Sequence, residues 1–494
     1  MTTAPLSLVA CSVVLALTAA SAQAAAPDLR LVEAVKAQDH TAIRSLIPRA
    51  DVGVREPDGT TAMHWAAYWD DRDTVSLLIR AGADVNARNE LGATPLWLAA
   101  SEGRAPMVDQ LLRAGAKPNV ALALGETPLM AAARAGSVES IKLLIARGAD
   151  VNAKEQARGQ TALMWAVAGR HPAVVRTLLE VGATLSARSN TRTMLVNTGK
   201  DGLTRLSEDY TDFYEENQGG FTPLLFAVRQ GDVECARLLL DAGASVEDAT
   251  PNGASALVLA THSGRWPMAS MLLKRGANPN AAEAGYTALH AALVRDNNEF
   301  AKTLIARGAD VNARIAKSTP VRRFAQDFAV DPNWIGANAF WLAARFVDAP
   351  LMRYLVASGA NPLVTSRTGA TALIAAATGA RRSGGRQSVA DVEKTVVEAA
   401  QVALELGIDT NATDTAGDTA LHVASARRLN SVAEFLVQKG AAVSGRNRES
   451  ATPLSLASID YSTWTAVQLG YVKYRAMRSD GSTASLLRRL GAVE

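Results

Sequence analysis

Six histidines are the residues of this chain best suited to acid–base chemistry or metal binding. Imidazole titrates near neutral pH, and its ring nitrogens ligate Zn²⁺. No two of the histidines have the close spacing of a zinc motif, and the two cysteines are too far apart in sequence to complete one. The sequence therefore predicts no metal and no cofactor. The histidines are His40, His64, His171, His262, His290 and His422.

Motifs for nucleophilic catalysis or phosphate binding are also missing. The sequence contains no Gly-x-Ser-x-Gly elbow and no Gly-x-Gly-x-x-Gly loop. Gly199-Lys200 precedes Asp201, where a phosphate loop needs Ser or Thr. Acidic pairs such as Asp70-Asp71 are predicted at turns, where carboxylates are normally solvated. We therefore expect a protein that is not an enzyme and has no catalytic residues.

Three of the histidines belong to a pattern that recurs about every 33 residues. A threonine stands three residues before the histidine, and threonine is a preferred N-cap of a helix. In other copies the threonine precedes Pro-Leu, and proline suits the first helical position because its missing N–H is not needed there. Each copy therefore predicts the start of a helix. The histidine copies hold His64, His290 and His422, and the Thr-Pro-Leu copies begin at Thr94, Thr127, Thr222 and Thr452.

A second helix is predicted later in each copy. The apolar pair Leu143 and Leu144 marks its inward face, and Leu239 holds a similar place in a later copy. Gly148 then suits a left-handed C-cap. A helix–turn–helix unit of this size cannot bury its own apolar face, so neighbouring units must stack.

The recurring pattern resembles that of the ankyrin family. The resemblance implies an all-α repeat solenoid of about twelve helix-turn-helix units with connecting hairpins, in a single domain over residues 25–494. It also implies that the three patterned histidines belong to hydrogen-bond networks at helix starts. Atypical units beginning at Leu31 and Thr452 are expected to cap the two ends. The other units are expected to open near Gly59, Gly92, Gly125, Gly159, Gly220, Gly253, Gly285, Gly336, Gly369 and Gly417.

Three insertions interrupt the period, at about 191–218, 315–335 and 378–390. The first contains the acidic and aromatic run 208–216, and the third contains the glycine and arginine run 381–386. Insertions in a solenoid fall on one face and are often used for binding. The alternatives are that they are tolerated surface loops, or that the first one folds over the concave face.

Charge and hydropathy indicate the class of partner and the compartment. The balance of 51 basic and 48 acidic residues, a net charge of +3, does not favour a nucleic-acid partner. An apolar run over 6–20, followed by Ala22-Gln23-Ala24, predicts a signal peptide at 1–24, although no basic residue precedes Arg30. Its removal leaves Cys235 as the single cysteine, expected to be a buried apolar residue.

We therefore expect an exported protein, in the periplasm of a bacterium, because the chain is rich in alanine, uses arginine more than lysine and can form no internal disulfide after cleavage. No stable membrane span is expected after signal cleavage. A lipid anchor and an uncleaved N-terminal tether are the alternatives.

The resemblance also implies a binding surface, because family members commonly bind proteins through hairpin tips and the exposed face of each first helix. Eight of the 25 aromatic residues (8 Trp, 8 Tyr and 9 Phe) fall on that face, and Trp and Tyr are typical of binding hot spots. Arginines there, including Arg134 and Arg427, suit a polar rim or carboxylate binding. The expected partner-binding residues are Trp65, Tyr68, Trp69, Trp165, Phe221, Phe226, Arg229, Tyr286, Arg295, Arg345 and Phe346.

These observations predict a non-catalytic protein–protein interaction scaffold or adaptor that acts outside the cytoplasm. Its partner is expected to be another protein, such as a co-exported enzyme or an envelope component. One alternative is a glycan or small-ligand binder whose tryptophans are stacking platforms, and another is an enzyme with its site in an insertion. The aromatic residues can also fill gaps between first helices, as we expect for Trp97 and Met130.

Overall fold

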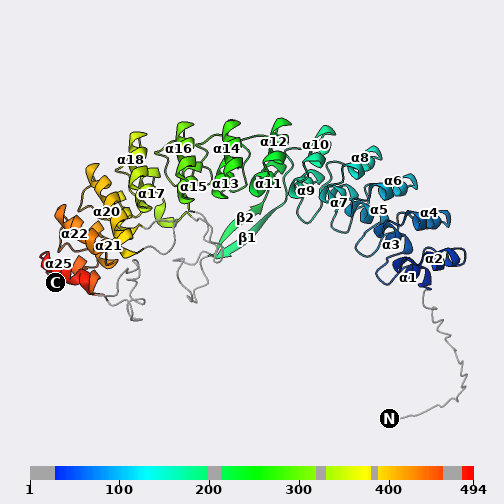
Figure 1. The fold of residues 1–494 in the computed structure, drawn as a ribbon, viewed down its shortest axis with the longest axis horizontal. Coiled ribbons are helices and arrows are strands. Elements are labelled where there is room, and N and C mark those ends of the chain that lie inside the picture. The colour runs from blue at the N-terminus through cyan, green and yellow to red at the C-terminus, as the bar shows by residue number, and fades with distance from the viewer. Residues whose placement is uncertain (1–27, 198–212, 319–329, 380–387, 460–480, 494) are drawn as a thin grey trace, which may run out of the picture.

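The structure is a computed structural model that describes residues 28–197, 213–318, 330–379, 388–459 and 481–493. Within these ranges, twelve pairs of helices stack into a curved array (Figure 1). The predicted all-α repeat solenoid is therefore confirmed, with the addition of one two-stranded sheet. The predicted signal peptide at 1–24 lies outside the described residues.

The first helix of each pair lies on the inner, concave side of the array (Figure 1). These helices are short because the sequence turns polar or reaches glycine within about two turns. They are α1 (Arg30–Lys36), α3 (Ala62–Tyr68), α5 (Pro95–Ser101), α7 (Pro128–Ala135), α9 (Ala162–Ala168), α11 (Pro223–Gln230), α13 (Ala256–His262), α15 (Ala288–Val294), α17 (Ala339–Arg345), α19 (Ala372–Thr378), α21 (Ala420–Ala426) and α23 (Pro453–Ser458).

The second helices form the outer, convex side (Figure 1). Most are nine residues long and have one apolar face that packs on the first helices. They are α2 (His40–Leu46), α4 (Arg72–Arg80), α6 (Ala105–Arg113), α8 (Val138–Ala146), α10 (Pro172–Glu180), α12 (Val233–Asp241), α14 (Trp266–Lys274), α16 (Asn298–Ala306), α18 (Ala349–Ala357), α20 (Val389–Glu405), α22 (Asn430–Gln438) and α25 (Ser482–Arg489).

The predicted helix starts and unit openings are confirmed. The Oγ1 atom of Thr94 accepts a hydrogen bond from the backbone N–H of Trp97, which satisfies one donor at the start of α5. All ten glycines predicted to open units have positive φ. At Gly253 a Cβ atom would lie 2.7 Å from the backbone carbon of Glu283, so the neighbouring hairpin leaves no room for a side chain.

The three patterned histidines connect each helix start to the next hairpin. In α3, Nδ1 of His64 lies 2.8 Å from Oγ1 of Thr61, and Nε2 lies 3.0 Å from the carbonyl oxygen of Ala93. The ring therefore accepts at Nδ1 and donates at Nε2, which requires the neutral form. His290 and His422 make the same two kinds of contact.

Asparagines in the connecting loops link successive units. The Nδ2 atom of Asn86 donates to the carbonyl of Gly115, and its Oδ1 accepts from the N–H of Lys117, both in the next unit. This pair of bonds fixes the spacing of neighbouring units because one amide side chain serves both. The same pair of bonds is made by Asn119, Asn152, Asn280, Asn312 and Asn411.

Two of the insertions lie in connecting hairpins, and the third follows the end of a first helix. The first forms the antiparallel strands β1 (Thr191–Asn197) and β2 (Phe213–Gly219), which project on the concave side (Figure 1). In the described part of the second, the 3₁₀ turn η1 (Pro332–Trp334) forms. The third separates α19 from α20, as expected, but α20 begins at Val389, inside the predicted insertion, and runs for 17 residues. Residues 198–212, 319–329 and 380–387 lie outside the described residues.

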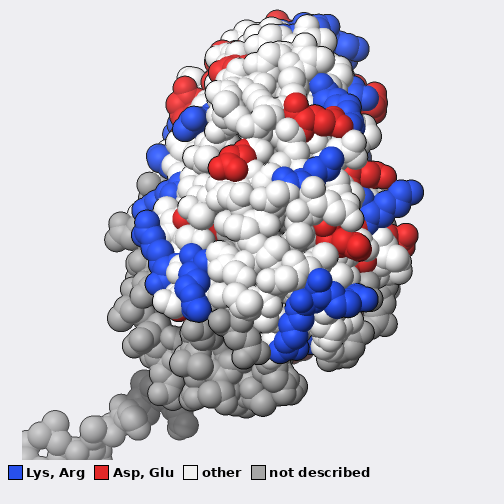
Figure 2. All heavy atoms as spheres, turned by 90° about the vertical axis from the view of Figure 1, so that its left-hand side faces the viewer, with Lys and Arg blue, Asp and Glu red and all other residues white. Residues whose placement is uncertain are grey.

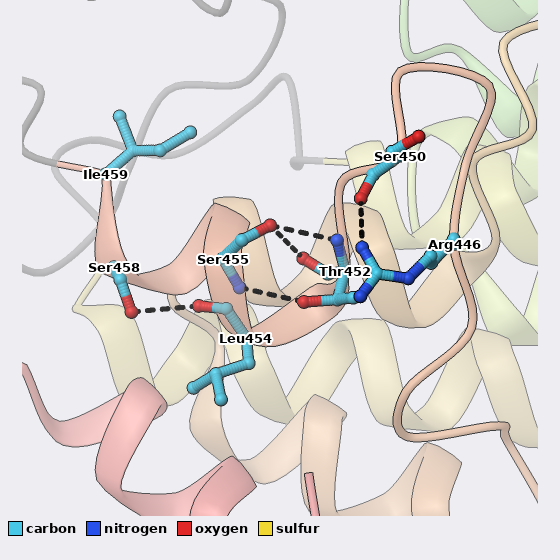
Figure 3. Close-up of a pocket in the computed structure, with 7 residues that line it drawn as sticks. All are labelled: Arg446, Ser450, Thr452, Leu454, Ser455, Ser458 and Ile459. Carbon is cyan, nitrogen blue, oxygen red and sulfur yellow. Dashed lines mark hydrogen bonds between the residues drawn. The ribbon is translucent and has the colours of Figure 1, made fainter. Parts of the chain in front are cut away.

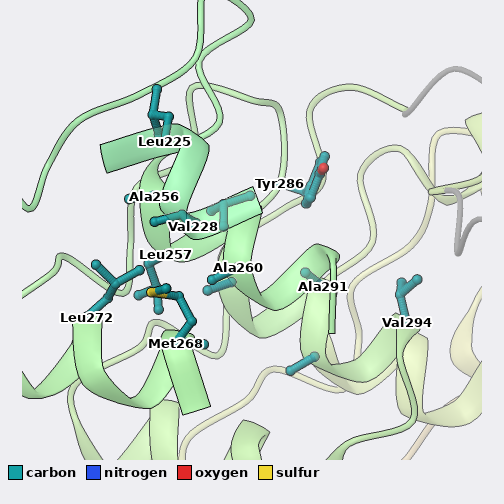
Figure 4. Packing of buried hydrophobic residues seen from close by; sticks show 14 of the residues in the cluster. Leu225, Val228, Ala256, Leu257, Ala260, Met268, Leu272, Tyr286, Ala291 and Val294 are labelled. Carbon is teal, nitrogen blue, oxygen red and sulfur yellow. The ribbon is translucent and has the colours of Figure 1, made fainter. Parts of the chain in front are cut away.

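One continuous apolar core runs between the two layers of helices. Figure 4 shows part of it, where Leu257 and Met268 meet between α13 and α14. Leu239 is fully buried, as predicted, and so is Cys235. Leu143 is only half-buried, although the sequence predicted it to face inward. Leu144 beside it is the fully buried member of the pair, because a helix turns adjacent residues about 100° apart.

Truncating a core leucine should destabilise the array. We expect Leu239→Ala to lower the free energy of unfolding by about 2–5 kcal/mol, because it leaves a void in a fully buried site. Leu143→Ala is the matched control and should lower the free energy of unfolding by clearly less. Urea unfolding followed by circular dichroism measures both. Equal losses for the two variants would contradict the placement of these side chains.

Acid should weaken the array through His290. Burial lowers the pKa of this imidazole from 6.5 to about 4, so the unfolded chain binds a proton more readily than the folded chain. The neutral His290 ring therefore makes its full contribution to the free energy of unfolding above pH 6.5. This contribution is lost as the pH falls toward 4. We expect a loss of about 2–3 kcal/mol between pH 7 and 4.5 in urea unfolding. The His290→Gln variant should lose less over the same interval, and a parallel decline would overturn this assignment.

Candidate protein-binding face

The concave face, which we define as the inner surface made by the first helices and the hairpin tips, carries most of the predicted contact residues. The predicted residues come from α3 to α17 and are spread along the array (Figure 1).

The α3 aromatic cluster, Trp65, Tyr68 and Trp69, is the group most open to solvent. Tyr68 is 38% exposed and Trp69 is 41% exposed. Their ring centroids lie 4.9 Å apart in an edge-to-face arrangement, which is favourable for aromatic pairs. Trp65 lies behind them, with its centroid 6.5 Å from that of Trp69. The cluster therefore offers two exposed rings held by mutual contacts.

Trp65 has a structural role as well. Its indole Nε1–H donates to Oε2 of Glu56 at 2.6 Å, and the ammonium of Lys36 lies 4.6 Å from the ring centroid. Lys36 also pairs with Glu56 at 3.2 Å. Trp65 is half-buried against the core. The sequence placed it on the exposed face with the other two aromatics, and this placement is only partly right, because Glu56 and Lys36 hold the ring from the preceding hairpin and the preceding unit.

A similar arrangement surrounds Trp165 in α9. The guanidinium carbon of Arg134 lies 5.3 Å from the ring centroid, and Arg134 pairs with Glu126 at 3.4 Å. Burial raises the pKa of Glu126, while the charge of Arg134 opposes this shift. The indole nitrogen of Trp165 is buried and has no hydrogen-bond partner. Trp165 is half-buried and so offers less surface than the α3 aromatic cluster.

Phe221, Phe226 and Arg229 meet at the base of the β1–β2 hairpin. The guanidinium carbon of Arg229 lies 4.9 Å from the ring centroid of Phe221 and 5.3 Å from that of Phe226. Arg229 is exposed and Phe221 is half-buried, but Phe226 is only 5% exposed. The prediction of an exposed Phe226 is therefore wrong. The neighbouring Phe221 and Arg229 cover its ring.

Tyr286 is also in the core, so its prediction as a contact residue is wrong (Figure 4). Its hydroxyl lies 3.3 Å from Nδ1 of His262, and burial raises the pKa of Tyr286 to about 12. Arg295 is half-buried and donates from Nε to the carbonyl of His262 at 2.6 Å. Phe346 is half-buried, with its ring edge-to-face against Trp334. These side chains fill the space between neighbouring units.

The structure adds two exposed leucines that sequence reasoning missed. Leu91 is 71% exposed and Leu124 is 62% exposed, each directly before a unit-opening glycine. The two hairpin tips are neighbours, because the N–H of Ala123 donates to the carbonyl of Leu91 at 2.9 Å. The signal was available in the sequence: most other tips carry a polar or small residue at this position. Met130 is buried and Trp97 is half-buried, as expected for gap-filling side chains.

A cavity of about 360 Å³ lies beside α23 (Figure 3). Its polar groups are largely engaged with one another. Oγ of Ser455 donates to the carbonyl of Thr452, and Oγ of Ser458 donates to that of Leu454. Nη1 of Arg446 donates to the carbonyl of Ser450. Both hydroxyls therefore donate to backbone carbonyls of α23 and its N-cap, and they form no acid–base pair with each other in the described structure.

In the part of the chain that the structure describes, no group of three His, Cys, Asp or Glu side chains is placed to hold a metal ion. No helix within the same residues has the length and apolar character to cross a membrane. Burial raises the pKa of the Cys235 thiol, which keeps it protonated. At the C-terminal end, charges of both signs are scattered over a mostly uncharged surface (Figure 2).

The chain matches known proteins through its repeats. Family models of ankyrin repeats match residues 31–121, 106–189, 194–283, 246–315 and 416–448. The chain is 33% identical over 239 residues to ankyrin repeat and SOCS box protein 16 of Homo sapiens, covering 48% of this chain and 47% of that protein. It is 24% identical over 312 residues to the E3 ubiquitin-protein ligase KEG of Arabidopsis thaliana, covering 56% and 18%. It is 30% identical over 161 residues to a putative ankyrin repeat-containing protein of Treponema pallidum, covering 32% and 46%.

These matches span less than half the length of each curated relative. Among solved structures, the human ASB11 ankyrin repeat domain aligns with a TM-score of 0.40 and 27% identity, covering 50% of this chain and 98% of that one. The matched family models together cover more than half of the 494 residues. With its stacked helix pairs, capping threonines and linking asparagines, the chain belongs to the ankyrin repeat family.

Proposed function

We propose that this protein is a non-catalytic adaptor that binds another protein through its concave face, outside the cytoplasm. Ankyrin repeat proteins generally mediate protein–protein interactions, and the family is typically non-catalytic. The observation that carries the proposal is the exposed pair Tyr68 and Trp69 on α3. The proposed location is supported by the signal-like sequence at 1–24.

Exposure of the apolar surface of Tyr68 and Trp69 to water is unfavourable in free energy. Burying apolar surface contributes about 25 cal/mol per Å², so two large aromatic side chains open to solvent represent unused binding free energy. Their edge-to-face contact limits the rotamers that each ring can adopt. Binding therefore orders few additional torsions, which favours Tyr68 and Trp69 as hot-spot residues.

The hairpin tips extend the proposed interface. Leu91 and Leu124 are exposed apolar side chains on two neighbouring tips, which belong to the units that follow α3 and α5. A protein partner lying in the concave face can contact a first helix and the adjacent tips together. A partner of this size also buries the area that a specific interface needs, about 800 Å² on each side.

The placement of the tryptophans favours a protein partner over a glycan. A stacking platform needs an open ring face, but Trp65 packs against the core beneath the ammonium of Lys36. Trp165 packs against the core beneath the guanidinium of Arg134. Among Trp65, Tyr68, Trp69 and Trp165, the aromatic side chains that could serve as platforms, Tyr68 and Trp69 are exposed, and their rings meet edge to face.

The Tyr68→Ala/Trp69→Ala double variant tests the proposal. Proteins captured from an envelope extract by photo-crosslinking through the concave face identify the partner, and titration calorimetry then gives its affinity. We expect the double variant to bind at least about 30-fold more weakly, since two hot-spot rings are removed. Its unfolding free energy should change by less than about 1 kcal/mol because both side chains are exposed.

Val181→Ala is the matched control, since Val181 is 42% exposed at the end of α10, a second helix. It should bind like the unaltered protein. If the double variant and the control capture and bind the same proteins equally, the α3 aromatic cluster is not the interface. Trp65→Ala is a poor probe because Trp65 supports the fold through Glu56 and Lys36.

A further inference from the structure

Two arginines from different units lie against the turn that follows α11. Arg170, in the turn between α9 and α10, donates from Nη2 to the carbonyl of Gln230 at 3.0 Å. Arg265, the residue before α14, packs on the next position of the same turn. A Cβ atom on Gly231 would lie 2.9 Å from Cδ of Arg265 and 3.4 Å from its Nε. These contacts place the two side chains at adjacent backbone positions.

Arg229, in the last turn of α11, adds a third positive charge beside this turn. Its guanidinium carbon lies 4.9 Å from the ring centroid of Phe221 and 5.3 Å from that of Phe226, at the base of the β1–β2 hairpin. The two rings hold the guanidinium group on the concave face. We call Arg170, Arg229 and Arg265 the α11 arginine patch, and all three residues are exposed.

No carboxylate neutralises the α11 arginine patch, because none of its arginines forms an ion pair within the described residues. Asp232, next to the turn, accepts a hydrogen bond from the N–H of Cys235 at 3.1 Å as the N-cap of α12. Glu234, in the first turn of α12, forms no ion pair with the patch in that part of the chain. The carbonyl end of α11 carries only about half a negative charge, which falls short of three guanidinium groups.

Most hydrogen-bond donors of the patch are available to a ligand. Arg229 and Arg265 make no hydrogen bond in the described structure, and Arg170 uses Nη2 for its bond to the turn. A guanidinium group has five N–H donors in a planar fork that matches the two oxygens of a carboxylate. The patch therefore offers several paired donors, on side chains that already contact the protein surface.

We propose that the α11 arginine patch binds an acidic segment of a protein partner, one that presents several carboxylates along a short stretch of chain. Three separate cations match several carboxylates better than they match one small anion, and charge-assisted bonds of this kind are about twice as strong as neutral ones. The balance of 51 basic and 48 acidic residues gives the whole chain no general attraction for polyanions such as nucleic acids. A local acidic epitope is therefore the occupant that fits.

The inference rests on the proposed function only in that the ligand is a protein. The patch lies around the end of α11, away from α3 along the array (Figure 1), and uses none of the α3 aromatic cluster. The two surfaces contribute differently, since complementary charge mainly orients a partner and speeds its association, whereas buried aromatic rings mainly contribute affinity.

The Arg229→Gln/Arg265→Gln variant tests the patch, with an end-blocked, fluorescent hexaglutamate peptide as the probe. Binding to the full chain is measured by fluorescence anisotropy at low ionic strength, and hexalysine is the control of opposite charge. We expect the unaltered chain to bind hexaglutamate and not hexalysine, and the variant to bind hexaglutamate about 10-fold more weakly, since two ion pairs are lost. Circular dichroism and the urea midpoint should stay unchanged, because neither side chain makes a hydrogen bond in the described structure.

Arg80→Gln/Arg176→Gln is the charge-matched control. Both arginines are exposed, lie on second helices and form no ion pair in the described structure, so this variant should keep the unaltered affinity. Tyr68→Ala/Trp69→Ala should also bind hexaglutamate normally, so failure of the patch and failure of the α3 interface are distinguishable. Absence of hexaglutamate binding, or equal weakening in the patch and charge-matched variants, would overturn the proposal. So would tighter binding of an oligothymidylate, lost in the same patch variant, because it assigns the patch to nucleic acid.

Discussion

Contact between neighbouring units is the constraint on which this structure depends. A pair of short helices has too little apolar surface to fold alone, so each unit is stable only with a neighbour on each side. The continuous core supplies the apolar part of that contact. Asparagines such as Asn119 and Asn152 supply the polar part, because each one accepts from and donates to the backbone of the next unit. Both parts must hold together, since a shift of one unit would break the amide bonds and open the core.

Because neighbouring units depend on each other in this way, the residue type can vary only at positions that take no part in stacking. Residues of the core and the helix starts are committed to stacking, as His64 illustrates through its contacts with Thr61 and the next hairpin. The exposed ends of the first helices, the hairpin tips and the insertions are not committed in this way. The exposed residues Tyr68, Trp69, Leu91 and Leu124 all lie in such places, on a rigid support. That combination of variable side chains and a fixed frame suits recognition of another protein.

Charged side chains on the concave face are placed by neighbouring units. Lys36 and Arg134 each reach from one unit to an aromatic ring of a later unit, and each also contacts a glutamate. Arg427 donates instead to the backbone carbonyls of Ala377 and Gly379 at the end of α19, in the preceding unit.

Local chemistry was sufficient to predict the architecture of this protein from its sequence. Threonine caps, unit-opening glycines and apolar pairs act within a few residues of one another, so the helix pairs and the insertions were located in advance. The exposure of individual side chains was not predictable in this way. Phe226 and Tyr286 hold positions equivalent to exposed ones, yet both are buried: Phe226 lies beneath Phe221 and Arg229 of its own unit, and Tyr286 lies against His262 of the preceding unit. Sequence patterns determined each unit, and only the tertiary structure decided which side chains are covered, because burial depends on contacts, within a unit and between units, that a repeating pattern does not specify.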